Sequence, residues 1–433
     1  MSITNQISEP TALSAIAAQL SLEVAPQQEP AQALAQVLTS KPQAAFSPTV
    51  MAFAQQLSET LRHDPRCRSY PDLLALGFWL RAGNLARLAQ SYQDHTVRLG
   101  RGLAFHFAPN NVTTLFAYSL ILSLLSGNSN VVRLGQKSTP EQHILLNIIQ
   151  ELTAQHQECA SRILIVRYGH DDAVNRFFCA HCAVRIIWGG DSTVEHLRAL
   201  PMPAGSCELT FANKFSWALI DACHYLNHSN DEAWRHATAQ SFITDAFAFG
   251  QQGCSSPRLI LWHGAPSTVT QAQEQFWLSV DQALQTRPFA LSPAQISERF
   301  LAASSAMVAA YQHGIKPQAQ PQAQLVASGD GASYLRLALS SWDELERDAH
   351  QGNGLFYELT VDSLTEVLAH CSDHEQTICS LGPTAEEWQQ AIAATPPQGL
   401  CRIEAWGRAL EFNRIWDGYD LIGTMSRALT IAL

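Results

Sequence analysis

The fold is decided by residues 103–134, which read LAFHFAPNNVTTLFAYSLILSLLSGNSNVVRL. Residues 103–107 are short, apolar and flanked by turn residues, which predicts a strand. Residues 113–126 predict a buried helix, and Gly127 stands where a helix commonly ends in a left-handed residue. Residues 130–134 predict a second strand. This order is that of a βαβ unit, whose two strands lie parallel in one sheet.

The alternation continues along the chain. Helices are expected at 140–156, 171–178 and 192–200, and strands at 162–168, 184–188 and 215–221. Parallel sheets bind ligands at the carboxyl ends of their strands. Two turns are expected at such ends, namely residues 109–111 (PNN) and 189–191 (GGD).

A second α/β unit is expected to begin near residue 222. Residues 231–249 have a helical pattern, and an apolar strand is expected at residues 259–262, after Cys254. Residues 1–45 are rich in Ala, Gln and Pro and low in charge, and we expect short helices in a peripheral arm there.

The bulk composition excludes several classes of protein. The chain has 433 residues, 46% of them hydrophobic, and a net charge of −11. A nucleic-acid binder would carry a basic stripe, so we expect no nucleic-acid partner. The apolar run at residues 112–125 is shorter than a membrane span needs, and the N-terminus lacks the features of a signal peptide. We expect a cytoplasmic protein whose ten cysteines are free thiols.

Cys254 is the first candidate for chemistry. It lies in the segment 251–258, QQGCSSPR, whose small residues leave room for a substrate. A thiolate exchanges one thioester for another at little cost, which suits acyl transfer. The alternative is a buried cysteine at a tight turn, and the local sequence does not decide between the two.

Two further residues fit parts of such a site. Glu208 is a single carboxylate in an apolar stretch, where a raised pKa would suit proton transfer. The alternative is an exposed residue on a strand edge. Asn111 lies between a strand and a helix, where its amide can donate to an oxyanion or simply cap the helix.

Metal and standard dinucleotide motifs are not found. Cys179, His181 and Cys182, with His170 nearby, match no standard zinc spacing, and core packing is favoured for them. The sequence contains neither a GxGxxG nor a Walker A motif.

Several stretches together resemble the aldehyde dehydrogenase superfamily. More closely, they resemble the acyl-CoA reductase family that includes the fatty-acid reductase subunit of bacterial bioluminescence systems. The resemblance runs from about residue 100 to the C-terminus. It rests on segments 107–111 (FAPNN), 127–133 (GNSNVVR), 188–191 (WGGD), 208–211 (ELTF), 252–257 (QGCSSP) and 414–418 (RIWDG).

The resemblance implies a role for each candidate. Cys254 matches the nucleophile, Asn111 the amide of the oxyanion hole and Glu208 the general base. The cofactor-binding positions are Pro109, Arg133, Gly189, Gly190 and Asp191, with Gly190 and Asp191 beneath the pyrophosphate. Two positions depart from the pattern: Thr210-Phe211 replaces a Gly-Gly pair, and Asp191 replaces a common Ser.

The implied fold has two Rossmann-like three-layer α/β/α domains with a small C-terminal, oligomerisation-type element. We expect an N-terminal arm plus cofactor domain at 1–222, a catalytic domain at 223–405, and a tail at 406–433 that returns to the first domain. We also expect a homo-oligomer.

The implied reaction is the reduction of a long-chain fatty acyl-CoA, or another acyl thioester, to the aldehyde through an acyl-cysteine. The acyl donor is CoA, an acyl-protein or an acyl-activating partner enzyme. NADPH is preferred to NADH, because residues 131–139 contain no acid, while Arg133 and Lys137 suit a 2′-phosphate. The alternatives are a CoA-acylating or hydrolytic aldehyde dehydrogenase working toward oxidation, and a non-redox acyl-relay subunit.

Overall fold

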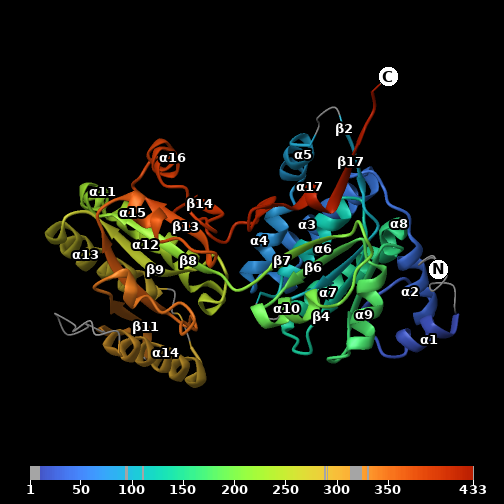
Figure 1. Cartoon of the computed structure of the whole chain (residues 1–433), viewed down its shortest axis with the longest axis horizontal. Coiled ribbons are helices and arrows are strands. Elements are labelled where there is room, and N and C mark those ends of the chain that lie inside the picture. The colour runs from blue at the N-terminus through green and yellow to red at the C-terminus, as the bar shows by residue number, and fades with distance from the viewer. Residues whose placement is uncertain are drawn as a thin grey trace. The chain divides into compact units, whose positions relative to one another are not determined.

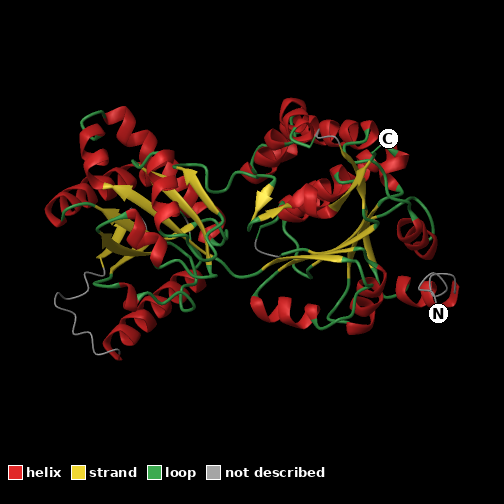
Figure 2. Ribbon diagram, turned by 45° about the horizontal axis from the view of Figure 1, so that its top comes forward, coloured by secondary structure: helices red, strands yellow, loops and turns green. Residues whose placement is uncertain are grey.

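The computed structural model describes residues 10–92, 96–109, 112–286, 289, 291–312, 324–328 and 331–432. The chain divides into two compact units. The first comprises residues up to Ala212 together with Phe412 onward, and the second comprises Asn213–Glu411. Figures 1 and 2 show that each unit has a sheet with helices on both faces.

The first unit has a six-stranded sheet of order β1-β5-β4-β3-β6-β7. Its strands are β1 (Ser21–Val24), β3 (Leu103–Phe107), β4 (Ser129–Leu134), β5 (Ile163–Arg167), β6 (Val184–Trp188) and β7 (Cys207–Phe211). All pairs are parallel except β1 with β5. The strand order reverses between β3 and β6. Ligands bind at such a switch point, and the turns after β3 and β6 both lie there.

Helices cover both faces of this sheet. The buried cluster on one face draws on α1 (Pro10–Ala17), α2 (Pro30–Thr39), α9 (Asp172–His181) and α10 (Asp191–Arg198). The remaining helices of the unit are α3 (Pro48–His63), α4 (Pro71–Trp79), α5 (Ala82–Gln90), α6 (Leu115–Leu125), α7 (Pro140–Gln155), α8 (Gln157–Ala160) and the short 3₁₀ turn η2 (Pro65–Cys67). Helix α6 is buried on every side, which explains why its sequence is apolar except for Ser119 and Ser123.

Gly127 ends α6 as the sequence predicts. Its φ is +91°, and an added Cβ would lie 2.2 Å from the carbonyl oxygen of Gln43. Only glycine fits there, because both the backbone angle and the available space exclude a side chain.

The expectation of a peripheral N-terminal arm was wrong. Strand β1 pairs with β5 at the edge of the sheet, and Leu34 and Val37 of α2 are fully buried. This region has a low charge because it packs against the sheet, and the low charge does not indicate an arm.

The C-terminal residues complete the first unit. Strand β17 (Ser426–Thr430) pairs with β2 (Thr96–Gly100), as Figure 1 shows in red and cyan. Before it lie β15 (Ile415–Trp416) and β16 (Tyr419–Asp420), which form a hairpin, and α17 (Leu421–Met425).

The second unit has a seven-stranded sheet of order β10-β11-β12-β9-β8-β13-β14. The strands are β8 (Phe215–Asp221), β9 (Pro257–His263), β10 (Gln324–Ser328), β11 (Gly331–Ala338), β12 (Leu355–Val361), β13 (Glu375–Leu381) and β14 (Arg402–Ala405). Only β10 runs antiparallel to its neighbour. Strand β8 joins this sheet, not the first one, where the alternation had placed it. Its apolar sequence fits either sheet.

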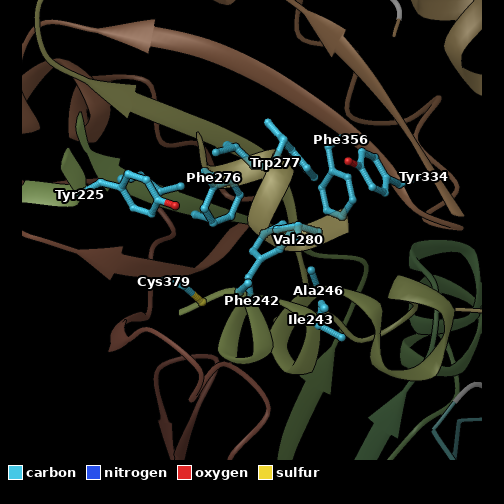
Figure 3. Packing of buried hydrophobic residues seen from close by; sticks show 14 of the residues in the cluster. Tyr225, Phe242, Ile243, Ala246, Phe276, Trp277, Val280, Tyr334, Phe356 and Cys379 are labelled. Carbon is cyan, nitrogen blue, oxygen red and sulfur yellow. The ribbon is translucent and has the colours of Figure 1, made fainter. Parts of the chain in front are cut away.

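Two clusters of buried side chains fill the faces of this sheet. Helices α11 (Ala222–His228), α12 (Glu232–Phe247) and α13 (Pro266–Thr286) pack on one face. Helices α14 (Pro293–Gln312), α15 (Leu364–Ala369) and α16 (Ala385–Ala394), with the turn η4 (Trp342–Glu344), lie on the other. Figure 3 shows the first cluster, where Phe242 and Phe276 meet edge to face with centroids 5.2 Å apart.

A buried carboxylate braces this aromatic core. Glu358 accepts hydrogen bonds from the indole N–H groups of Trp262 and Trp277, each at 2.9 Å, and from Nε of Arg336 at 2.7 Å. The Arg336 guanidinium also lies 4.7 Å from the Trp277 ring centroid. The charge is thus paired, as a buried ion must be.

The elements and the three-layer α/β/α class agree with the sequence prediction, including β3, β6 and β8 to the residue. The domain bounds at 222 and 405 stay a proposal. Within the described residues, no helix is both long and apolar enough to cross a bilayer.

Candidate active site

Cys254 lies in a strained loop between α12 and β9. After α12 the chain makes a 3₁₀ turn, η3 (Ala248–Gln251), in which Phe249, Gly250 and Gln251 have φ angles of +53°, +66° and +62°. Left-handed conformations at non-glycine residues carry a cost, so neighbouring contacts must hold them in place.

The buried side chain of Gln251 supplies those contacts. Its amide nitrogen donates to the carbonyl oxygens of Pro257 at 2.8 Å and Leu355 at 2.9 Å, and its amide oxygen accepts from the Gly354 N–H at 2.9 Å. The Asn353 N–H also donates to Gly250 O at 3.0 Å. The loop is therefore fastened to the start of β12.

Gly253 sets the shape of the loop just before the cysteine. An added Cβ would lie 3.0 Å from the Ser256 hydroxyl oxygen and 3.1 Å from Cδ2 of Leu410. The Ser256 N–H donates to Gly253 O at 3.0 Å, which closes a turn around Cys254. The small residues noted in the sequence thus serve close packing around the turn.

Cys254 differs from most other cysteines in its accessibility. Its side chain is partly exposed, whereas Cys67, Cys159 and Cys371 are buried. Burial raises the pKa of those three thiols, to about 11 for Cys67 and about 12 for Cys159 and Cys371. Because the thiolate is the nucleophile, these buried groups are poor candidates for acyl transfer.

Gln376, on β13, contacts the Cys254 thiol directly. Its amide Nε2 lies 3.2 Å from Sγ, and its Oε1 accepts a hydrogen bond from the Ser255 hydroxyl at 2.6 Å. Gln376 and Ser255 are fully buried, so the amide is fixed in one orientation. Sequence reasoning missed Gln376, because it lies 122 positions from Cys254. The two come close only because β8 pairs with both β9 and β13.

A cation also lies near the thiol. Arg258 is half-buried, 5.9 Å from the Phe215 ring centroid, and its buried Nε has no hydrogen-bond partner among the described residues. Burial lowers the pKa of Arg258, and charge attraction to Cys254 opposes that shift. A positive charge at this place favours the thiolate of Cys254.

The Gly189–Asp191 turn lies at the switch point of the first sheet. Gly190 precedes the first turn of α10 without a side-chain cap, and Asp191 is the exposed first residue of that helix. At Gly189 an added Cβ would lie 3.2 Å from Cγ2 of Thr193. Backbone N–H groups at such a helix start suit a pyrophosphate, although the Asp191 charge opposes it. Pro109 follows β3 at the neighbouring strand end.

Arg133 lies at the end of β4, and Lys137 follows that strand. The Arg133 guanidinium is 5.1 Å from the Tyr168 ring centroid, and its buried Nε has no hydrogen-bond partner within the described part of the chain. Lys137 is exposed. An arginine with an unused donor beside an exposed lysine fits a phosphate group.

A comparison with protein families identifies the family to which the chain belongs. The profile described as "Acyl-CoA reductase (LuxC)" matches residues 84–427. The chain belongs to this acyl-CoA reductase family. The resemblance seen in the sequence is thereby confirmed.

Solved structures with the same fold include aldehyde dehydrogenases. Lactaldehyde dehydrogenase from Escherichia coli is 13% identical, with 96% of this chain and 95% of that chain covered and a TM-score of 0.63. Indole-3-acetaldehyde dehydrogenase of P. syringae, a C302A mutant in complex with NAD⁺ and IAA, is 12% identical over 88% and 82% of the two chains, with a TM-score of 0.58. A search of curated protein sequences found no significant match. Family and fold together give acyl-CoA reductase or aldehyde dehydrogenase-type chemistry.

Of the other two catalytic candidates, Glu208 lies in the first unit. Asn111 falls outside the described residues. Glu208 is near the amino end of β7, where Arg185 donates from Nε to Oε2 at 2.6 Å and Arg198 lies 3.0 Å from Oε1. Arg185 also donates to the carbonyl oxygens of Leu197 and Leu200, at 2.7 and 2.9 Å. The carboxylate thus ties β6, β7 and α10 together.

Replacing Glu208 with glutamine tests whether it is also a base. For that role Arg198 or Arg185 must release a carboxylate oxygen. We expect acylation to remain measurable in Glu208→Gln, while later proton-dependent steps slow by about 10²-fold and the pH–rate profile loses a limb. An unchanged profile accompanied by a lower melting temperature would assign Glu208 to the ion pairs alone.

The cysteines and histidine considered as metal ligands have protein contacts. Cys179 and Cys182 are buried, and the Cys182 thiol contacts Cys179 O at 3.4 Å. His181 Nδ1 lies 2.6 Å from Phe177 O. Over the ranges that the structure describes, no three potential ligands of these types gather.

Proposed function

We propose that the protein reduces a long-chain fatty acyl-CoA, or a related acyl thioester, to the aldehyde with NADPH through an acyl group on Cys254. The observation that carries this proposal is the partly exposed Cys254 thiol, held by Gln376 in a loop that its neighbours fix. Arg258 adds a positive charge, as a nucleophilic thiolate requires.

The first half-reaction is thioester exchange. The Cys254 sulfur attacks the acyl carbon, and the carbon–sulfur bond to CoA breaks, so that CoA leaves as its thiolate. The Cys254 backbone N–H and the Asn111 amide stabilise the oxyanion formed on the way. The product is an acyl-cysteine and free CoA.

The second half-reaction releases the aldehyde. When bound, the nicotinamide cofactor supplies a hydride to the acyl carbon. Hydride addition leaves an alkoxide on the carbon bonded to Cys254, and this alkoxide takes up a proton to become the thiohemiacetal. Loss of that proton, with breaking of the carbon–sulfur bond, then releases the aldehyde and restores the thiolate. Water must be kept from the acyl-cysteine before this step, because hydrolysis would give the acid.

Replacing Gln376 with leucine should make Cys254 less reactive. The substitution removes an N–H donor from the sulfur, and a hydrogen bond to a charged group contributes about 1.5–3 kcal/mol. We expect iodoacetamide to alkylate Cys254 about tenfold more slowly at pH 7, with the pH profile of alkylation moved upward. The control is Gln252→Leu. Gln252 lies in the same loop, but the hydrogen bond that its amide donates goes to Gln351 O, at 2.7 Å. Equal rates in the two variants would leave Gln376 with a packing role only.

Replacing Arg133 with alanine should weaken the binding of NADPH far more than the binding of NADH. A charge-assisted contact to the 2′-phosphate contributes about 1.5–3 kcal/mol. Its loss should therefore raise KM for NADPH by a factor of about ten to a hundred. Steady-state kinetics with both cofactors measures this preference. Equal effects on both, or a wild type that prefers NADH, would contradict the assignment. The neighbours determined with NAD⁺ support a nicotinamide dinucleotide but not this choice.

Acyl-CoA-dependent loss of NADPH absorbance separates the proposal from its alternatives. The proposed reductase consumes NADPH only when acyl-CoA is present. An acyl-relay subunit would take up the acyl group and leave the absorbance flat, and an oxidative enzyme would instead form NADPH from aldehyde. The proposal extends to a CoA or protein-bound acyl donor, a homo-oligomeric assembly and a cytoplasmic location.

A further inference from the structure

A hollow lies in the first unit, formed by the end of α4, helix α5 and residues 412–414. Its volume is about 200 Å³, and its lining includes Trp79, Asn84, Arg87, Phe412, Asn413 and Arg414. Arg414 opens the RIWDG segment, a family marker in the sequence to which the proposed mechanism gives no role. The hollow therefore calls for a ligand of its own.

Aromatic stacking holds the wall of this hollow in place. The Phe412 ring stacks on Tyr118 of α6 at 4.6 Å between centroids, with an interplanar angle of 22°. The Tyr118 hydroxyl donates to Asn413 O, and Trp79 lies 5.1 Å from the Tyr118 ring. The Asn84 amide donates to Trp79 O at 2.7 Å. The hollow is thus built on the core helix α6 and not on a loose surface segment.

A tight hairpin positions Arg414. Strands β15 and β16 are joined by Asp417 and Gly418, whose φ angles of +47° and +77° are those of a type I′ turn. The Arg414 guanidinium lies 5.5 Å from the Tyr92 ring centroid and 3.7 Å from Asp420. This geometry keeps it only 38% exposed, at the edge of the hollow.

Two of the residues that line the hollow are arginines, Arg87 and Arg414. Arg87 is exposed and donates to Asn84 Oδ1 at 3.3 Å. Arg98 lies 5.1 Å from the Tyr92 ring, so Tyr92 has two guanidinium groups near it, and Asp420 is the carboxylate paired with Arg414. In a chain of net charge −11, such a local excess of arginine favours an anionic ligand.

We propose that this hollow binds the 3′-phosphorylated adenosine end of the acyl-CoA substrate, an inference that rests on the proposed function. The two arginines match a phosphate, and the Trp79 and Phe412 side chains offer apolar and aromatic surface to a purine. The 2′-phosphoadenosine of NADPH has the same chemistry. It is assigned instead to the carboxyl edge of the first sheet, where Arg133 and the Gly189–Asp191 turn lie.

The test replaces Arg87, whose side chain is exposed, with glutamine. Isothermal titration with 3′,5′-ADP and with 2′,5′-ADP measures nucleotide binding without any turnover. We expect Arg87→Gln to weaken 3′,5′-ADP about tenfold and to leave 2′,5′-ADP unchanged. Arg68→Gln, at an exposed arginine outside the hollow, should change neither.

Kinetics add a second readout on the same variants. KM for a long-chain acyl-CoA should rise about tenfold in Arg87→Gln, while KM for the matching acyl-pantetheine, which lacks the nucleotide, stays the same. Unchanged binding of 3′,5′-ADP, an equal loss of 2′,5′-ADP, or an equal rise in KM for acyl-pantetheine would overturn the proposal. A wild type that reduces no acyl-CoA would refute the proposed function, while the titration would still decide whether the hollow binds the nucleotide.

Discussion

Cys254→Ala should lose acyl-CoA reduction down to the uncatalysed background. The substitution removes the sulfur that becomes covalently bonded to the acyl group, and no other side chain on this loop can replace it. Ser255 and Ser256 are fully buried, and a serine hydroxyl without a base is a weak nucleophile. Cys254 is only partly buried, so alanine should leave the melting temperature within a few degrees of wild type.

A matched control for this variant is Cys223→Ala. Cys223 is the exposed cysteine of α11, on the same unit. If accessibility alone made a thiol reactive, the two variants would lose activity together. We expect Cys223→Ala to retain normal turnover of acyl-CoA with NADPH. Normal turnover in Cys254→Ala would refute the acyl-cysteine mechanism.

Asn111→Ala should lower kcat by about 10²–10³, the usual loss when one oxyanion donor is removed. In sequence, Asn111 follows the end of β3 by four residues and precedes the start of α6 by four, which is where the family resemblance implies the amide of the oxyanion hole. An amide there can meet an oxyanion that forms only during acyl transfer, so the loss should appear in kcat, with little change in cofactor affinity.

The adjacent amide provides the comparison for Asn111. Asn110→Ala removes a similar side chain one residue earlier, and we expect it to retain kcat within a few-fold. Single-turnover acylation measured for both variants locates the defect in the first half-reaction. An Asn111→Ala enzyme as active as Asn110→Ala would leave Asn111 without a catalytic role; the alternative of a helix cap was wrong, because the N-cap of α6 is Thr114.

The sequence predicts the strand ends near the proposed cofactor site well, because local physics fixes them. Strands β3 and β6 are short and apolar, and the turns at Pro109 and at Gly189-Gly190 end them. Gly127 marks the end of α6 because only glycine fits its backbone angle. Such signals lie within a few residues of the feature that they predict.

The sequence does not reveal which strands pair when they lie far apart along the chain. Strand β8 has an apolar sequence suited to either sheet, and β1 pairs with β5 about 140 positions away. The contact of Gln376 with Cys254 depends on which strands become neighbours in the second sheet. Likewise, the ion pairs of Glu208 require Arg185 opposite it in the register of β6 with β7. None of these follows from the residues adjacent in sequence.

The central claim is that Cys254 carries the acyl group, and intact-protein mass spectrometry tests it most directly. The wild type is mixed with a long-chain acyl-CoA in the absence of cofactor, and the protein is then digested to map any adduct. We expect one acyl group per chain, on the peptide that contains Cys254. This acyl group should disappear, with release of aldehyde, when NADPH is added. An adduct on another cysteine, or reduction of acyl-CoA by enzyme that never becomes acylated, would contradict it.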